Sequence, residues 1–159
     1  MSSLQNIVTS KYICMEECHI SSILEIENQS YDYPWSEKIF QDCINHNYLC
    51  RVILIDNVLI GYVISSIVQD ECHIMNLCIK DDHRRSGYGR YMLDELHKEV
   101  IKINCKLVFL ECRPSNRSAL KLYKSEGYNE IGIRKNCGQI LGLLMIMGLI
   151  TLLFQQLNR

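Results

Sequence analysis

The stretch Arg84-Arg85-Ser86-Gly87-Tyr88-Gly89-Arg90 decides the fold, because it joins a strand-like run to a helix-like run through two glycines. The run before it, His73 to Ile79, is mostly apolar and typical of a buried strand. After it, apolar residues recur at three- and four-residue spacing and predict the buried face of a helix of about four turns. These residues are Met92, Leu93, Leu96, Val100 and Ile103. The two glycines therefore lie where the predicted helix begins.

This glycine stretch has the chemistry of an anion-binding loop. Glycine lets a ligand approach the main chain, and the first free N–H groups of a helix favour a phosphate. Arg84, Arg85 and Arg90 add positive charge. A plain strand-to-helix turn with solvated arginines explains two glycines equally well. The spacing fits neither the P-loop nor the G-x-G-x-x-G nucleotide motif, because Met92 stands at the third glycine position.

Length and composition predict a single globular domain over residues 1–159. Hydrophobic residues make up 48% of the chain and charged residues 22%, which excludes disordered and collagen-like classes. The formal net charge of -1 gives no reason to expect direct binding of nucleic acid.

The nine cysteines are odd in number, scattered, and never arranged as C-x-x-C. They indicate neither a zinc site nor a disulfide framework, so we expect no metal and a reducing, cytoplasmic compartment. Residues 1–10 lack the basic start and apolar core of a signal peptide, which favours the same compartment.

The N-terminal part predicts a short strand over 12–15, a helix over 16–29 and a second helix from Ser36 to about Asn45. Between the helices lies a loop with Pro34 and the only tryptophan, Trp35. Trp35 has two interpretations, which are compatible with each other: it plugs the core, and it lines a binding groove.

The middle of the chain predicts an antiparallel meander. Two β-rich segments, 50–55 and 58–68, flank Asp56-Asn57, which favours a tight hairpin. A second turn at Asp70-Glu71 leads into the strand before the glycine stretch.

The following segment predicts a strand, a helix and another strand. Residues 106–113 are nearly all apolar, as expected for a strand buried on both faces, and Pro114 ends it. Ser115 or Asn116 caps the next helix, Gly127 closes it, and 128–133 form the next strand.

Glu111 and Tyr123 are the candidate catalytic residues. Strand alternation places Glu111 on the same side as Leu107 and Phe109, which is unusual for a carboxylate unless it borders a cleft. Partial burial there would favour its protonated form, the tuning that a general base working near neutral pH requires. An ordinary ion-paired glutamate, and a tyrosine that only packs in the core, are the alternatives.

Together these motifs resemble the GNAT superfamily of N-acetyltransferases. Its first signature matches Arg84-x-x-Gly87-x-Gly89, and its second matches the segment from Glu111 to Tyr128. Residues 31–136 are further similar to the bacterial ribosomal-protein-alanine N-acetyltransferases, the RimI type. The resemblance implies a mixed, mostly antiparallel α/β sheet of six or seven strands with about four helices. It also implies acetyl transfer from acetyl-CoA to the N-terminal α-amine of a ribosomal protein by direct attack.

The resemblance also implies roles for single residues. Glu111 would take a proton from the ammonium, and Tyr123 would protonate the departing CoA thiolate. Backbone from Leu77 through Cys78 to Ile79 would bind pantetheine, and Asn116 would bind the thiol arm. The pyrophosphate would lie on the segment Arg85, Ser86, Gly87, Tyr88, Gly89 and Arg90, which follows Arg84 of the signature. Trp35 and Glu111 would contact the acceptor.

The C-terminal segment 137–159 departs from that family. Residues 140–154 carry only Thr151 as a polar side chain, where the family has a polar loop and a last strand. We expect a last strand of five to eight residues, an exposed apolar tail that promotes self-association, and no membrane span. An acetyltransferase for lysines or small amines, and a CoA-binding protein with a damaged acceptor groove, remain the alternatives.

Overall fold

The computed structural model describes residues 9–136 and 139–149, which form a seven-stranded sheet and four α-helices. The strands are β1 Ser10–Cys14, β2 Leu49–Ile55, β3 Val58–Val68, β4 Glu71–Ile79, β5 Leu107–Cys112, β6 Asn129–Asn136 and β7 Gln139–Gly148. The helices are α1 Ile20–Ser30, α2 Glu37–Asn45, α3 Tyr88–Lys102 and α4 Arg117–Ser125, with 3-10 turns at Glu17–His19 and Asp81–His83. The fold class expected from the sequence, a mixed α/β sheet that is mostly antiparallel, is confirmed.

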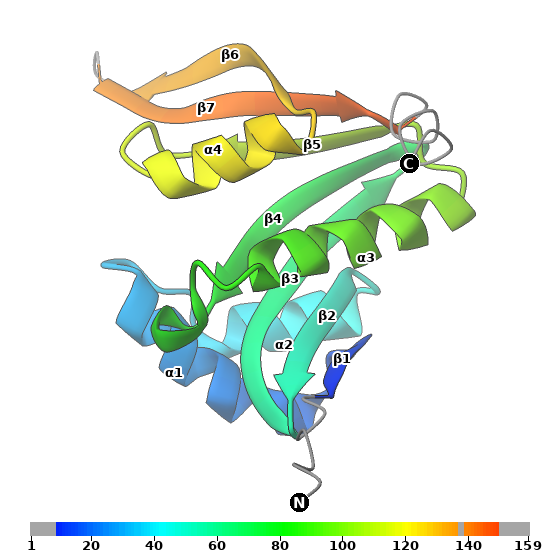
Figure 1. Ribbon diagram of the computed structural model, residues 1–159, viewed down its shortest axis with the longest axis vertical. Coiled ribbons are helices and arrows are strands. Elements are labelled where there is room, and N and C mark those ends of the chain that lie inside the picture. Colours follow the sequence, from blue (N-terminus) through cyan, green and yellow to red (C-terminus); the bar gives the residue numbers. More distant parts are fainter. Residues whose placement is uncertain (1–8, 137–138, 150–159) are drawn as a thin grey trace, which may run out of the picture.

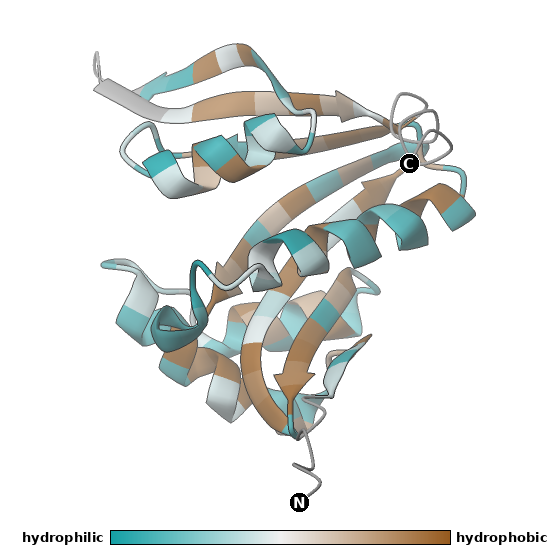
Figure 2. Cartoon of the chain, viewed as in Figure 1, coloured by the Kyte–Doolittle hydropathy of each residue, from teal (hydrophilic) through white to brown (hydrophobic). Residues whose placement is uncertain are grey.

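The sheet order is β1-β2-β3-β4-β5-β7-β6, and helices cover it from both sides (Figure 1). One core lies under α3 and α4 and includes Met92, Leu93 and Leu96 of α3. A second core lies under α1 and α2 and includes Phe40 and Tyr62. Apolar residues run along the strands, whereas the outer side of α3 is hydrophilic (Figure 2). This distribution follows from burying one stripe of each helix against the sheet.

The predicted meander is confirmed, since β2, β3 and β4 pair antiparallel in sequence order. Asp56 and Asn57 form the first turn with φ of 48° and 66°, the left-handed values that a tight hairpin needs. Gly127 closes α4 with φ of 95°, as expected. The next strand, β6, does not lie beside β5, because β7 inserts between them and pairs with both.

The parallel strands β4 and β5 pair over only part of their length. Their register runs from Glu71 opposite Leu107 to Ile74 opposite Leu110, and beyond that point the two strands separate. Figure 1 shows β4 and β5 diverging toward the side where the 3-10 turn at Asp81–His83 leads into α3. The separation leaves one edge of β4, from Leu77 to Ile79, without a strand partner among the described residues.

Three expectations were wrong in detail. Ile103 does not belong to the buried face, because α3 ends at Lys102 and Ile103 is 51% exposed. β5 is buried on one face only: Val108, Leu110 and Cys112 face the core, while the other face is partly open. β7 has ten residues, more than the five to eight expected, because it pairs with β5 and β6 simultaneously.

The apolar tail expected after the last strand falls on residues 150–159, which lie outside the described residues. Leu149, the last described residue, is buried, and its amide donates to the carbonyl of Lys106 at 2.8 Å. No helix in the described ranges has both the length and the apolar character needed to cross a membrane.

Candidate functional site

A cleft of about 670 Å³ opens where β4 and β5 separate. Its walls come from the end of α1, the free edge of β4, the start of α3 and the inner side of α4. Ten of the predicted site residues line it: Leu77, Cys78, Ile79, Arg84, Arg85, Gly87, Gly89, Arg90, Asn116 and Tyr123. Ser86 and Tyr88 belong to the same stretch of sequence, before and at the start of α3, but are not among the lining residues. The fold thus brings two motifs, about 30 residues apart in sequence, to one cleft.

The glycine stretch forms the N-terminus of α3, as the sequence predicts. Gly87 is the N-cap residue with φ of 87°, and its carbonyl accepts the first helical hydrogen bond, from Tyr91 at 3.0 Å. Two residues earlier, Arg85 also has a left-handed φ of 57°. An added Cβ on Gly87 would have no atom within 4 Å, so the space beside this backbone is open. The free N–H groups of the first turn, at the positive end of a 15-residue helix, face a cavity with room for an anion.

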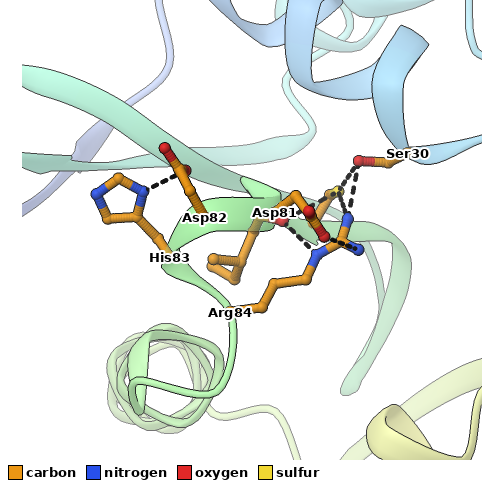
Figure 3. Close-up of polar contacts among 7 residues, drawn as sticks. Ser30, Asp81, Asp82, His83 and Arg84 are labelled. Carbon is orange, nitrogen blue, oxygen red and sulfur yellow. Dashed lines mark hydrogen bonds and ion pairs between the residues drawn. The ribbon is translucent and has the colours of Figure 1, made fainter.

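Arg84 holds the loop in place rather than presenting a free charge to the cleft. Its Nε donates to the carbonyl of Ile79 at 2.8 Å, and its Nη2 donates to Oγ of Ser30 at 2.9 Å. Its Nη1 lies 3.2 Å from a carboxylate oxygen of Asp81 (Figure 3). Arg84 therefore ties α1, the end of β4 and the 3-10 turn together, which was not foreseen from its charge alone.

The other two arginines of the loop differ from each other. Arg90 forms an ion pair with Glu126 and donates from Nη2 to Oγ of Ser125 at 2.9 Å, which links α3 to the end of α4. Arg85 is exposed at the edge of the cleft. Of the three predicted positive charges, Arg85 is the one that the described residues leave available for a ligand.

Asn116 and Tyr123 are the predicted site residues by which the α4 region borders the cleft. Asn116 is the N-cap, and its side-chain oxygen accepts from the amide of Ala119 at 3.2 Å, as predicted. Tyr123 is 8% exposed and packs edge-on against Tyr128 with ring centroids 5.7 Å apart. Burial, and then the nearby thiols of Cys112 and Cys78, raise the pKa of Tyr123 above its usual 10.0. Its hydroxyl therefore stays protonated at neutral pH.

Glu111 does not line this cleft, and its burial is limited, since 35% of its side chain is accessible. It lies on the face of β5 opposite the buried Cys112, exposed near the end of the strand. Nε of Arg134 donates to its two carboxylate oxygens at 2.8 and 3.0 Å, and Nη2 lies 2.8 Å from one of them. Glu111 and Tyr123 thus approach the end of β5 from opposite sides of the sheet.

Trp35 fits the first of its two interpretations, a packing role. It is partly buried in the core under α1 and α2, with its ring 5.6 Å from that of Phe40. Its amide donates at 2.9 Å to Glu27, a carboxylate that is 1% exposed. Glu27 also accepts from Tyr62 and, at 3.1 Å, from Asn76. Glu27 was not predicted from the sequence, where its signal is its position on the apolar face of α1.

Several lining residues were not predicted as site residues. These are Ser30, Tyr31, Asp81, Ser118, Ala119 and Leu122. The last two share a helical face with Tyr123, so their spacing was a usable signal. Ser30 and Tyr31 join the cleft only through the packing of α1 on β4: the Tyr31 hydroxyl donates to Asn76 at 3.3 Å.

Comparison with known proteins identifies the family. The sequence model of the acetyltransferase (GNAT) family matches residues 20–128, which is more than half of the chain and contains both motifs that line the cleft. The chain belongs to the GNAT family. It is therefore an acyltransferase enzyme.

Comparison with relatives places the chain among the RimI-like N-acetyltransferases of this family. The chain is 33% identical over 122 residues to the [ribosomal protein bS18]-alanine N-acetyltransferase of Escherichia coli K12, covering 77% of this chain and 82% of that protein. The crystal structure of the ribosomal-protein-S18-alanine N-acetyltransferase from Escherichia coli superposes with a TM-score of 0.82 at 29% identity, covering 89% and 94% of the two chains.

Another GNAT structure shows the fold together with a bound ligand. The PaiA N-acetyltransferase of Thermoplasma acidophilum, in complex with coenzyme A, has a TM-score of 0.70 at 14% identity and covers 88% of this chain and 99% of its own. In the present GNAT chain, the open space beside Gly87 fits a phosphate group, and the free edge of β4 fits an extended amide chain. These two features suit coenzyme A, in which a pyrophosphate joins the adenosine part to an amide-containing arm that ends in the thiol.

Proposed function

We propose that this enzyme transfers the acetyl group of acetyl-CoA to the N-terminal α-amine of a protein, with the N-terminal alanine of a small-subunit ribosomal protein as its acceptor. The similarity to the Escherichia coli enzyme that acts on ribosomal protein bS18 carries the acceptor assignment. The glycine loop at the start of α3 supports the cofactor assignment. The amides that follow Gly87, with exposed Arg85, would hold the pyrophosphate, the backbone of Leu77 to Ile79 the pantetheine, and Asn116 the thiol arm.

The positions of Glu111 and Tyr123 suggest how the reaction is arranged. An ammonium group has no lone pair, so it must lose a proton before it attacks the thioester. Exposed Glu111 would accept that proton through water on one side of the sheet. Tyr123, protonated in the cleft on the other side, would donate to the sulfur that leaves. Acceptor and cofactor would then meet at the gap between β4 and β5.

A second candidate is a CoA-binding protein with weak acceptor chemistry. β6 ends at Asn136 and β7 begins at Gln139, so the connection between them is only two residues long. The family that the sequence resembles has a polar loop on this side, and the sequence predicts that this loop is missing or altered here. A short connection would bind an acceptor peptide poorly and leave cofactor binding intact.

The cysteines support a cytoplasmic site of action. The eight cysteines in the described part of the chain are all free thiols, and six of them are buried. A reducing compartment keeps such thiols from forming disulfides.

Mass spectrometry of peptide acetylation tests the proposal. The full-length protein is incubated with acetyl-CoA and a peptide that begins with alanine and contains one internal lysine. A matched peptide has a blocked N-terminus and the same lysine, and a diamine serves as the small acceptor. We expect acetyl on the α-amine of the first peptide alone. Modification of the blocked peptide or the diamine would favour the lysine or small-amine alternative, and binding of acetyl-CoA without any product would favour the impaired protein.

A further inference from the structure

The C-terminal hairpin, formed by β6 and β7, contacts Glu111 at Gly142. Glu111 of β5 pairs with Leu144 of β7, and Arg134 of β6 pairs with Gly142 of β7. Alternation along β7 places residues 142 and 144 on one face, which is also the face that carries Glu111. The side chains of Glu111 and Arg134 therefore meet over Gly142, across the strand that separates β5 from β6.

Gly142 leaves the space that the Glu111 carboxylate occupies. An added Cβ at residue 142 would lie 2.6 Å from Cδ of Glu111 and would also overlap its Oε1 and Cγ. Real Cβ atoms do not approach other atoms this closely, so any other residue here would displace the carboxylate. Gly132 of β6 offers a contrast, because a Cβ there would meet Leu144 at an ordinary 3.4 Å.

Arg134 fixes the carboxylate from its other side. Two nitrogens of the guanidinium hold the carboxylate with three contacts of 2.8 to 3.0 Å, while 35% of the Glu111 side chain remains accessible. A planar guanidinium sets both the position and the plane of a carboxylate, which an ammonium does not. An exposed ion pair adds little stability, so a role in orientation explains this arrangement better than a role in folding.

We propose that Arg134 is a positioning residue for the catalytic carboxylate of Glu111. Gly142 leaves the space in which this carboxylate lies. The inference rests on the proposed role of Glu111 as the group that accepts the acceptor's proton. Arg134 and Gly142 touch neither the cleft nor the cofactor loop among the described residues. They act through Glu111 alone.

Steady-state kinetics with the alanine peptide test the proposal through four variants. Arg134→Met keeps an unbranched apolar stem and removes the guanidinium, and Arg134→Lys keeps the charge. Gly142→Ala adds the displacing Cβ. We expect Arg134→Met and Gly142→Ala to lower kcat by about 10- to 100-fold, as small misplacements of catalytic groups do, with the KM for acetyl-CoA unchanged. Arg134→Lys should recover part of the loss. Adding free guanidinium ions to an Arg134→Ala enzyme should also restore some activity.

Two comparisons separate this proposal from its alternatives. Gly132→Ala is the matched control and should keep the wild-type kcat. If Glu111→Gln is inactive while Arg134→Met and Gly142→Ala turn over at the wild-type rate, the positioning role is wrong and the proposed function stands. A faster Arg134→Met enzyme would also overturn it, since the ion pair would then restrain the carboxylate. If Glu111→Gln itself retains full activity, the proposed role of Glu111 fails, and this inference fails with it.

Discussion

The cofactor side of the cleft and the C-terminal hairpin side are built from different kinds of interaction. On the cofactor side, the loop at Gly87 and the cap at Asn116 work through local backbone geometry, and each is legible as a short motif. On the hairpin side, Glu111, Arg134 and Gly142 come from three strands and meet only after the sheet has formed. A single substitution can remove the loop geometry or the helix cap on the cofactor side. The contacts on the hairpin side depend on the register in which β5, β7 and β6 pair.

The largest expected effect is on the cofactor side. Gly87→Glu should abolish binding of acetyl-CoA in calorimetry, because it puts a side chain and a negative charge into the space for the phosphates. Gly127→Glu is the matched control: Gly127 has a similar φ of 95° but lies outside the cleft lining. If both variants are folded and bind acetyl-CoA equally, the assignment of the Gly87 loop as the phosphate site is wrong.

The second effect tests the chemistry at the border between the two sides. Glu111→Gln should keep the affinity for acetyl-CoA and lower kcat by roughly 10²–10⁴, the usual range for losing a positioned proton acceptor. Tyr123→Phe should also lower kcat, because it removes the protonated hydroxyl. Glu130→Gln is a suitable control, since Glu130 is an ion-paired carboxylate on β6 that lies 2.8 Å from Lys124. Wild-type kcat in both test variants would contradict the roles assigned here.

A third prediction concerns the packing of α3 against the end of α4. Burial lowers the pKa of His97 to about 4 from an ordinary 6.5. His97 lies beside Asp94 on its own helix, Glu126 after α4, and Tyr128, whose hydroxyl is 2.8 Å from Nε2. The unfolded chain takes up a proton below pH 6.5, and the folded protein does so only near pH 4. Stability is therefore lost as the pH falls between these values, by about 3 kcal/mol in total.

Urea unfolding at a series of pH values measures this loss. In His97→Leu the free energy of unfolding should depend less steeply on pH between 6.5 and 4. His73→Gln is the control, because His73 is partly exposed and lies 3.0 Å from Glu71. If the free energy of unfolding changes equally with pH in the wild type and in His97→Leu, His97 is not the source of the acid sensitivity.

The smallest effect is on a single helix cap. Asn116→Ala should lower the free energy of unfolding by about 1 kcal/mol, because the amide of Ala119 loses its acceptor. Ser36 is the N-cap of α2, but its side chain makes no capping hydrogen bond, so Ser36→Ala should cost less. Chemical denaturation of both variants measures the difference, and a larger loss for Ser36→Ala would contradict this account of the caps.

The sequence by itself determined the elements and the cofactor side, because those signals are local. Strand and helix periodicity, the Asp56-Asn57 turn, the Gly87 N-terminus and the Asn116 cap each depend on neighbours within a few residues. Boundaries moved by one to four residues: the helix expected from residue 16 begins at Ile20 after a 3-10 turn, as helix ends often do, and Ile103 fell outside α3.

Only the tertiary structure decided how distant segments are combined. The insertion of β7 between β5 and β6 made the last strand longer than expected and brought Gly142 under Glu111. The packing of α1 on β4 brought Ser30 to Arg84, which changed that arginine from a free charge into a structural tie. Burial of Glu27 beneath Trp35 followed from the same packing. Each of these contacts joins residues that no sequence period relates, so only the folded chain brings them together.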